Sequence, residues 1–331
     1  MLRRTGFVLF RENARYFREK LLKDGFCVVP GVLSAEKVAE FKTVSEKLLA
    51  APENKQFQED KFTGSLIPVS KDPAFAHLIA HGPFLDTFTA LGFRRPRWLS
   101  GFIISKPAPS PSLAWHQDGW YWDYPCSYQQ KPVQLFAMYY LSDTSPENGC
   151  LRVVPGSHNK ENALHAELKP AHSKEVRSAE EKLKHWRSDP LHQAADGCLD
   201  VAVKAGDLVL GDARVLHAAN PNESNERRTL ITLWYFPEYD EVPRPMQEAI
   251  AKLHLHQMGE LQKDWPEDAV KTMDALLPER FGLRHSKGDE YDHNLDFMVR
   301  QPGWCDNDDR SAKTWREMQS EQETEAKRQK T

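Results

Sequence analysis

TLITLWYF, residues 229–236, is an uninterrupted apolar and aromatic stretch with the length of one β-strand. Turn-forming residues separate several stretches of this kind in the middle of the chain, for example Asn148-Gly149 and Pro155-Gly156-Ser157. Many short strands with few helices among them predict a sandwich or barrel, and not a doubly wound parallel sheet. The other stretches of strand length are Trp98–Ser105, Val133–Leu141, Leu151–Val154, Leu199–Val203 and Asp207–Leu210.

Helical patterns flank this β-rich part on both sides. Apolar residues recur at helical spacing from about Arg11 to Lys23, and a short strand is expected at Phe26–Val29. Ser34 is the predicted N-cap of a second helix, and a third helix is expected from Pro73 to Leu91. Another helix is expected around Met246–Met258.

The pattern predicts one domain over residues 1–300 that is mainly β with flanking helices. The helices occupy about 11–91, the β core occupies about 97–237, and a helical extension follows. Residues 301–331 form a charged tail to which we assign no chemistry. The polar segment from Asn159 to Gly197 is a long insertion between two strands, and it and the C-terminal segment are the candidates for a lid.

Composition narrows the function classes. The chain has 331 residues, 40% of them hydrophobic and 28% charged, and its net charge of −4 spreads without a basic stripe, which argues against nucleic acid as the main partner. No apolar run approaches the roughly 20 residues of a membrane span. The five cysteines form no C-x-x-C pair and the start lacks a long apolar signal region, so we expect a cytoplasmic protein, with an organelle as the alternative that the basic start MLRRTGFVLFREN leaves open.

The segment Trp115-His116-Gln117-Asp118-Gly119 is the candidate metal site. Residues i and i+2 of a strand face the same side, so His116 and Asp118 can bind one ion, and His217 follows a later apolar segment. Two imidazoles and one carboxylate leave open positions for a chelating oxo-acid and dioxygen, which suits iron(II) oxygenases. The H-x-D pair alone is weak evidence, because chance gives such pairs and His165-Ala166-Glu167 is another.

An arginine that can bind a carboxylate follows His217 in the sequence. Arg228 opens the strand-like stretch 229–236, eleven residues after His217, and an arginine there can hold a distal carboxylate by two parallel hydrogen bonds. A dicarboxylate that chelates iron at one end requires such a partner at the other. Arg227 is adjacent, and strand alternation puts only one of the two inward; we select Arg228.

Together these motifs resemble the phytanoyl-CoA dioxygenase-like family of oxygenases over about Asp24 to Pro237, roughly two thirds of the chain. Several motifs in the right order make the resemblance more specific than the three metal-binding residues alone. The segments that carry it are Asp24-Gly25-Phe26-Cys27-Val28-Val29-Pro30-Gly31-Val32-Leu33, Ile104-Ser105-Lys106-Pro107, His116-Gln117-Asp118, Glu147-Asn148-Gly149-Cys150-Leu151, Pro155-Gly156-Ser157-His158, Gly206-Asp207, His217 and Arg228.

The resemblance implies a double-stranded β-helix (jelly-roll) core, Fe(II) and 2-oxoglutarate as cofactors, and release of succinate and CO2. It also implies that His116, Asp118 and His217 are the metal ligands and that Arg228 binds the 2-oxoglutarate carboxylate. Related halogenases replace the carboxylate ligand with a small residue, so an intact Asp118 favours hydroxylation of a small organic substrate.

The sequence departs from the family at one position. Met138 stands where family members often carry tryptophan, so the wall of the cosubstrate pocket differs and a branched acyl-CoA substrate is not assumed. Lys106, on the strand before the metal motif, is a candidate to bind the cosubstrate or an anionic substrate.

Two other function classes stay open from the sequence. One is a non-catalytic jelly roll that only binds a ligand, and the other is a cupin-like metalloenzyme that does not use 2-oxoglutarate. The first predicts a missing metal ligand or arginine, and the second does not require Arg228. Trp120, Tyr121 and Trp122 are predicted either to line a substrate pocket or to pack in the core. The sequence identifies neither the substrate nor the oligomeric state.

Overall fold

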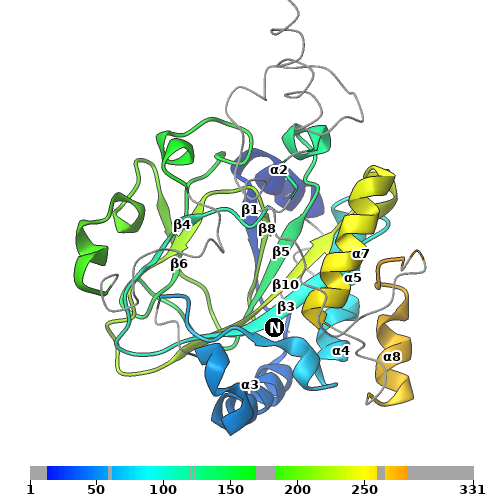
Figure 1. Cartoon of the computed structure of the whole chain (residues 1–331), viewed down its shortest axis with the longest axis horizontal. Helices are drawn as coiled ribbons and strands as arrows, with labels where there is room; N and C mark the ends of the chain where they lie inside the picture. The colour runs from blue at the N-terminus through cyan, green and yellow to red at the C-terminus, as the bar shows by residue number, and fades with distance from the viewer. Residues whose placement is uncertain are drawn as a thin grey trace, which may run out of the picture.

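The structure is a computed structural model, and it describes residues 13–58, 62–119, 121–122, 124–168, 183–258, 265–279 and 281. In these ranges the strands form two antiparallel sheets that face each other (Figure 1). Their bounds are β1 (Phe26–Val29), β2 (Ile67–Pro68), β3 (Arg97–Lys106), β4 (Leu113–His116), β5 (Leu135–Tyr140), β6 (Leu151–Val153), β7 (Leu199–Val201), β8 (Leu208–Asp212), β9 (His217–Ala219) and β10 (Arg228–Phe236).

The strand order confirms the predicted jelly roll. One sheet has six strands in the order β1-β8-β5-β10-β3-β2, and the other has four in the order β4-β9-β6-β7. From β3 to β10 the chain passes repeatedly from one sheet to the other, with β6 and β7 as consecutive strands of the smaller sheet, as in a double-stranded β-helix. All six predicted stretches of strand length contain a strand, and no end is shifted by more than two residues.

The larger sheet has two apolar faces. On β10 the residues Ile231, Leu233 and Tyr235 belong to the outer core, which the N-terminal helices and α8 (Glu267–Asp274) cover. Leu230 belongs to the inner core between the sheets. We call the side that faces the four-stranded sheet the inner face. Because side chains alternate along a strand, Arg228, Thr232 and Trp234 lie on the inner face with Leu230.

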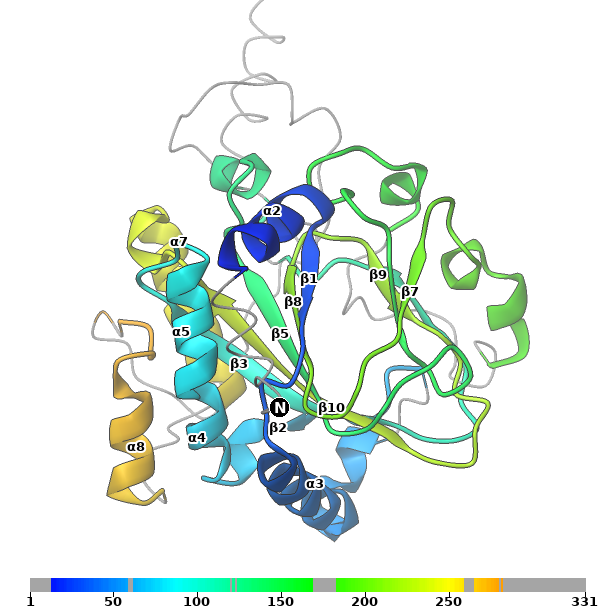
Figure 2. The ribbon, with the colours of Figure 1, turned by 180° about the vertical axis from the view of Figure 1, so that it is seen from behind.

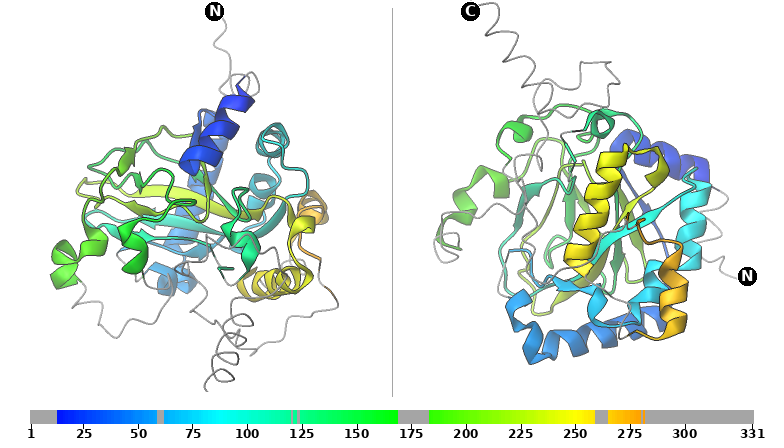
Figure 3. Two further views of the ribbon diagram at one scale, coloured as in Figure 1. Left: turned by 90° about the horizontal axis from the view of Figure 1, so that it is seen from above. Right: turned by 45° about the vertical axis from the view of Figure 1, so that its right-hand side comes forward.

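Helices cover the outer face and one end of the larger sheet (Figures 2 and 3). Ser34 Oγ accepts a hydrogen bond from the Lys37 amide, which confirms the predicted N-cap. The α-helices are α2 (Ala14–Asp24), α3 (Ala35–Ala50), α4 (Phe75–Ile79), α5 (Gly82–Ala90), α7 (Arg244–Met258) and α8 (Glu267–Asp274).

The single helix predicted from Pro73 to Leu91 is wrong. It is two helices, α4 and α5, that separate at Ala80 and His81. Pro83 lacks an amide hydrogen and is tolerated only in the first turn of a helix, so a new helix begins at Gly82.

The described parts of the insertion, residues 159–168 and 183–197, pack on the outer face of the four-stranded sheet. Leu164, Leu168 and Leu191 contact the core formed by Trp115, Val154, Leu216 and Ala218. The insertion contains short 3-10 helices at Ala163–Ala166, Trp186–Ser188 and Pro190–His192. Residues 169–182 and the tail 301–331 lie outside the described ranges, so the predicted lid stays a prediction.

Among the helices that the structure describes, none combines the length and the hydrophobicity that a membrane crossing requires.

Candidate functional site

His116, Asp118 and His217 meet at one end of the four-stranded sheet. His116 is the last residue of β4 and pairs with His217, the first residue of β9. One ligand atom from each of the three side chains lies within 4.8 Å of the others. The distances from Asp118 Oδ1 to His116 Nε2 and from Asp118 Oδ2 to His217 Nε2 are 3.6 and 3.5 Å.

The prediction that His116 and Asp118 lie on one face of the same strand is wrong, although their side chains do lie close together. β4 ends at His116, and Asp118 follows in the connection after it. The Asp118 amide donates to the Ala213 carbonyl at 2.8 Å, and its carboxylate Oδ2 accepts from Trp234 Nε1 at 2.9 Å. Contacts with the neighbouring chain, and not strand alternation, place this carboxylate.

Both histidines have the ring orientation that a metal ligand requires. Nδ1 of His116 lies 2.9 Å from the Ala114 carbonyl, and Nδ1 of His217 lies 3.0 Å from the Val215 carbonyl. A carbonyl oxygen only accepts, so each Nδ1 carries a proton, and Nε2 is the nitrogen that faces Asp118 and that a metal ion would use. Such backbone contacts fix the tautomer and the ring angle of metal-binding histidines. The donor set therefore fits a divalent iron ion.

The site is electrostatically coupled before any ion binds. Burial by itself would raise the pKa of Asp118, but the charge of His217, and then that of His116 and the Trp234 hydrogen bond, hold this pKa well below its usual value. For His217, burial lowers the pKa, but the charge and hydrogen bond of Asp118 raise it more, so the pKa of His217 lies above its usual value. Asp118 is therefore a carboxylate at neutral pH, as a metal ligand must be.

The inner face of the larger sheet closes the site from the other side. The Phe136 ring lies 5.2 Å from the His217 ring, and Trp234, which pairs with Phe136 across β10 and β5, reaches Asp118. The side chains of His116 and Asp118 keep 20% and 14% of their surface exposed, whereas His217 is buried. A small molecule can therefore reach this group of side chains.

Arg228 and Lys106 lie directly opposite each other on the inner faces of β10 and β3. Arg228 is buried, and among the described residues its Nε has no hydrogen-bond partner and its electrostatic neighbours are Tyr140 and Cys150. Burial lowers its pKa, which reflects the cost of a cation without a counter-charge. Lys106 Nζ donates to the Phe62 carbonyl at 2.5 Å. This arrangement fits a ligand carboxylate.

The other predicted residues lie as follows. Arg227 donates to the Ser105 carbonyl at 3.0 Å, so only Arg228 of the two arginines points inward. Met138 is buried on the inner face, directly opposite Thr232. Tyr121 and Trp122 are buried, Tyr121 in the core under α7, whereas Trp120 lies outside the described residues.

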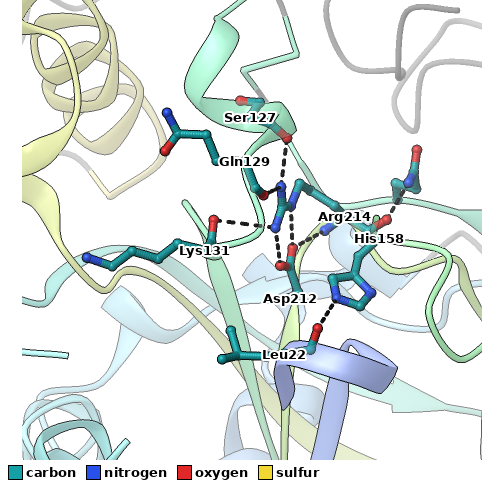
Figure 4. A network of polar contacts seen from close by, with 8 residues as sticks. Leu22, Ser127, Gln129, Lys131, His158, Asp212 and Arg214 are labelled. Carbon is teal, nitrogen blue, oxygen red and sulfur yellow. Dashed lines mark hydrogen bonds and ion pairs between the residues drawn. The ribbon is translucent and has the colours of Figure 1, made fainter. Parts of the chain in front are cut away.

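Sequence reasoning missed a buried ion pair beside the site (Figure 4). Arg214 Nη2 lies 2.6 Å from Asp212 Oδ2, and the same guanidinium donates to backbone carbonyls of the segment 127–131. The Arg214 carbonyl in turn accepts from Gln117, which lies between two of the predicted ligands. The i, i+2 spacing of opposite charges was the only signal, and it does not reveal burial.

Known proteins match this chain in sequence and in fold. The family model for phytanoyl-CoA dioxygenase matches residues 21–230. A probable alpha-ketoglutarate-dependent hypophosphite dioxygenase of Stutzerimonas stutzeri is 25% identical over 241 residues, which cover 69% of this chain and 78% of that protein.

Solved structures agree with the fold. The alpha-ketoglutarate-dependent epimerase SnoN from nogalamycin biosynthesis has a TM-score of 0.51 at 22% identity, covering 68% of this chain and 83% of that one. EctD from S. alaskensis with bound Fe has a TM-score of 0.50 at 20% identity, covering 68% and 76%.

These comparisons give no support to a non-catalytic or cupin-like protein. They agree with the three donors and with the buried cations at Arg228 and Lys106. The chain belongs to the phytanoyl-CoA dioxygenase family, and it is an iron- and 2-oxoglutarate-dependent dioxygenase.

Proposed function

We propose that His116, Asp118 and His217 bind Fe(II), that Arg228 binds the distal carboxylate of 2-oxoglutarate, and that the enzyme hydroxylates a small organic substrate. The observation that supports this most is the joint position of the two groups. Three metal donors lie within 4.8 Å of one another, and the buried guanidinium of Arg228, whose Nε has no partner among the described residues, lies on the inner face of the sheet that faces them.

When bound, iron and 2-oxoglutarate supply the oxidation: dioxygen and a substrate C–H bond give an alcohol, while 2-oxoglutarate gives succinate and CO2. The protein binds and orients. Arg228 and Lys106, opposite each other on β10 and β3, would both face the far carboxylate, and the buried Arg228 guanidinium would gain a counter-charge from it. Met138, opposite Thr232, lies between these cations and the metal-binding residues and forms part of the pocket wall.

We propose the class of substrate, a small organic molecule, and not its identity. An intact Asp118 favours hydroxylation, and the partly exposed His116 and Asp118 side chains admit a small molecule. A cytoplasmic location fits the scattered, unpaired cysteines; Cys27, Cys126, Cys150 and Cys198 form no disulfide in the described part of the chain.

The test is an anaerobic titration of purified metal-free protein with Fe(II) and 2-oxoglutarate, which forms a visible charge-transfer band when both bind. We expect the band in the wild type, its loss in Asp118→Ala and His217→Ala, and a higher 2-oxoglutarate requirement in Arg228→Ala. Absence of the band in well-folded wild-type protein would contradict the residue assignment. Far-UV circular dichroism of each variant separates lost binding from lost folding.

A further inference from the structure

Gln134 has a buried side chain with no partner, close to the metal-binding residues. It is 3% exposed, and neither Oε1 nor Nε2 has a hydrogen-bond partner among the described residues. A carboxamide has two donors and an acceptor oxygen with two lone pairs, so a buried glutamine without partners leaves all of them unsatisfied. Such groups are rare in native proteins and require an explanation.

Strand pairing places this side chain on the inner face. The Ala213 amide donates to the Gln134 carbonyl at 2.9 Å, which extends the β5–β8 pairing by one residue beyond Leu135. Gln134 lies in a bend immediately before β5, and because the Ala213 bond continues the β5–β8 register to it, we infer that its side chain shares the face of Phe136, two residues later. Ala213 also accepts from the Asp118 amide, so one residue lies between Gln134 and the proposed metal ligand.

Gln134 and Arg228 lie on opposite sides of the metal-binding residues. Phe136 and Trp234 pair with each other and contact His217 and Asp118, so they mark the level of the metal. Arg228 is six residues before Trp234, at the opposite end of β10. Gln134 lies beyond Phe136 in the other direction. A cosubstrate that extends from the metal toward Arg228 therefore leads away from Gln134.

A second buried hydrogen-bond donor, Trp122 Nε1, lies beside the residue that follows Asp118. Trp122 is 1% exposed and its Nε1 has no partner among the described residues. This nitrogen lies 2.9 Å from the position that a Cβ on Gly119 would take, so the indole packs against the residue that follows Asp118.

The arginine that follows Ala213 already has a counter-charge. Arg214, on the neighbouring segment, is bound by Asp212 and by the carbonyls of Ser127 and Gln129. Neither Gln134 nor Trp122 carries a charge. A charged ligand group in contact with them would lose its hydration without gaining a counter-ion, which is strongly unfavourable.

We propose that Gln134 is the polar anchor of the substrate, and that the group it binds is uncharged and both donates and accepts hydrogen bonds, such as a carboxamide or hydroxyl. Trp122 Nε1 supplies an additional donor. This inference rests on the proposed function, because it takes the metal level as the boundary between cosubstrate and substrate. If Gln134 has this role, the enzyme prefers an uncharged substrate group over a small oxyanion.

The experiment uses matched probes on the Fe(II)- and 2-oxoglutarate-loaded wild type, under anaerobic conditions. Hexanamide, hexanol and benzamide are compared with hexanoate, benzoate and hypophosphite, and the perturbation of the charge-transfer band reports their binding. We expect the amides and the alcohol to act at concentrations at least tenfold below those of the anions. Gln134→Met removes this preference while the apparent Kd for 2-oxoglutarate stays within twofold.

Tyr139→Phe is the matched control, because Tyr139 lies on the outer face of β5 and its hydroxyl is also buried without a partner among the described residues. Both variants remove an unsatisfied group and are expected to raise the Tm of the metal-free protein. Only Gln134→Met changes probe selectivity. The proposal is overturned if the anions bind as tightly as the amides or if no neutral probe binds. It is also overturned if Gln134→Met keeps the wild-type selectivity, because Gln134 would then bind only an ordered water. Failure of the wild type to form the band contradicts the proposed function instead.

Discussion

Trp234 and Asp118 join the two sheets at the metal-binding end, with the indole Nε1 donating to the carboxylate Oδ2 at 2.9 Å. The two residues are 116 positions apart in sequence. Trp234 lies on the inner face of β10, and Asp118 follows the end of β4. The larger sheet therefore orients a carboxylate that the smaller sheet supplies.

Loss of this hydrogen bond is expected to weaken metal binding. In Trp234→Phe the aromatic packing remains, but Asp118 Oδ2 loses its donor and the carboxylate can rotate away. Partners of this kind are worth about 10–100-fold in metal affinity. Competition of Fe(II) with a chromophoric chelator measures the change, and an affinity equal to the wild type would show that the indole only fills space.

Replacement of Arg228 is expected to affect 2-oxoglutarate and not iron. Arg228→Met removes charged hydrogen bonds worth about 1.5–3 kcal/mol, which corresponds to roughly 10- to 150-fold in cosubstrate affinity. The titration is followed by the charge-transfer band at saturating Fe(II). Arg227→Met is the control, because Arg227 contacts the Ser105 carbonyl, and its 2-oxoglutarate affinity is expected to match the wild type.

Binding of the cofactors is expected to raise thermal stability. The three donors approach one another only in the folded chain, so the ion binds the native state preferentially and contributes about 2.7 kcal/mol at a free concentration 100 times its Kd. The measurement is differential scanning fluorimetry of metal-free protein with and without anaerobic Fe(II). His217→Ala is expected to show no increase; an increase as large as that of the wild type would place the ion elsewhere.

The Asp212–Arg214 pair is expected to be essential for stability. Both side chains are at least 97% buried, and Arg214→Met leaves the Asp212 charge without its partner. Breaking a buried pair from one side costs about 3–5 kcal/mol. Urea unfolding at pH 7 measures this, and a loss below ~1 kcal/mol would mean that water or His158 replaces the arginine.

The same pair predicts how stability depends on pH. Burial raises the pKa of Asp212, but Arg214 and then His158 outweigh it, so this pKa lies below 3.8 in the native state. The stabilisation is present above the unfolded pKa, near 3.9, and is lost as the pH falls through the native value. In Arg214→Met the pKa of Asp212 rises, so the difference from the wild type is expected to narrow below about pH 5. A difference that stays constant from pH 7 to pH 4 would contradict this.

The sequence by itself determined the class of fold and the identities of the candidate ligands. Uninterrupted apolar stretches such as 229–236 form strands that are buried on both sides, because each side packs against another layer. His116, Asp118, His217 and Arg228 could be selected since few residue types bind iron or a carboxylate, and their order along the chain is specific.

Only the tertiary structure decided how these residues are held. Asp118 was expected on a strand, yet its position depends on Ala213 and Trp234, which are about 100 residues away in the chain. The unsatisfied amide of Gln134 and the burial of the Asp212–Arg214 pair are equally invisible in sequence. The physical reason is that alternation and spacing report which side a residue faces, whereas hydrogen-bond partners and desolvation depend on segments that only folding brings together.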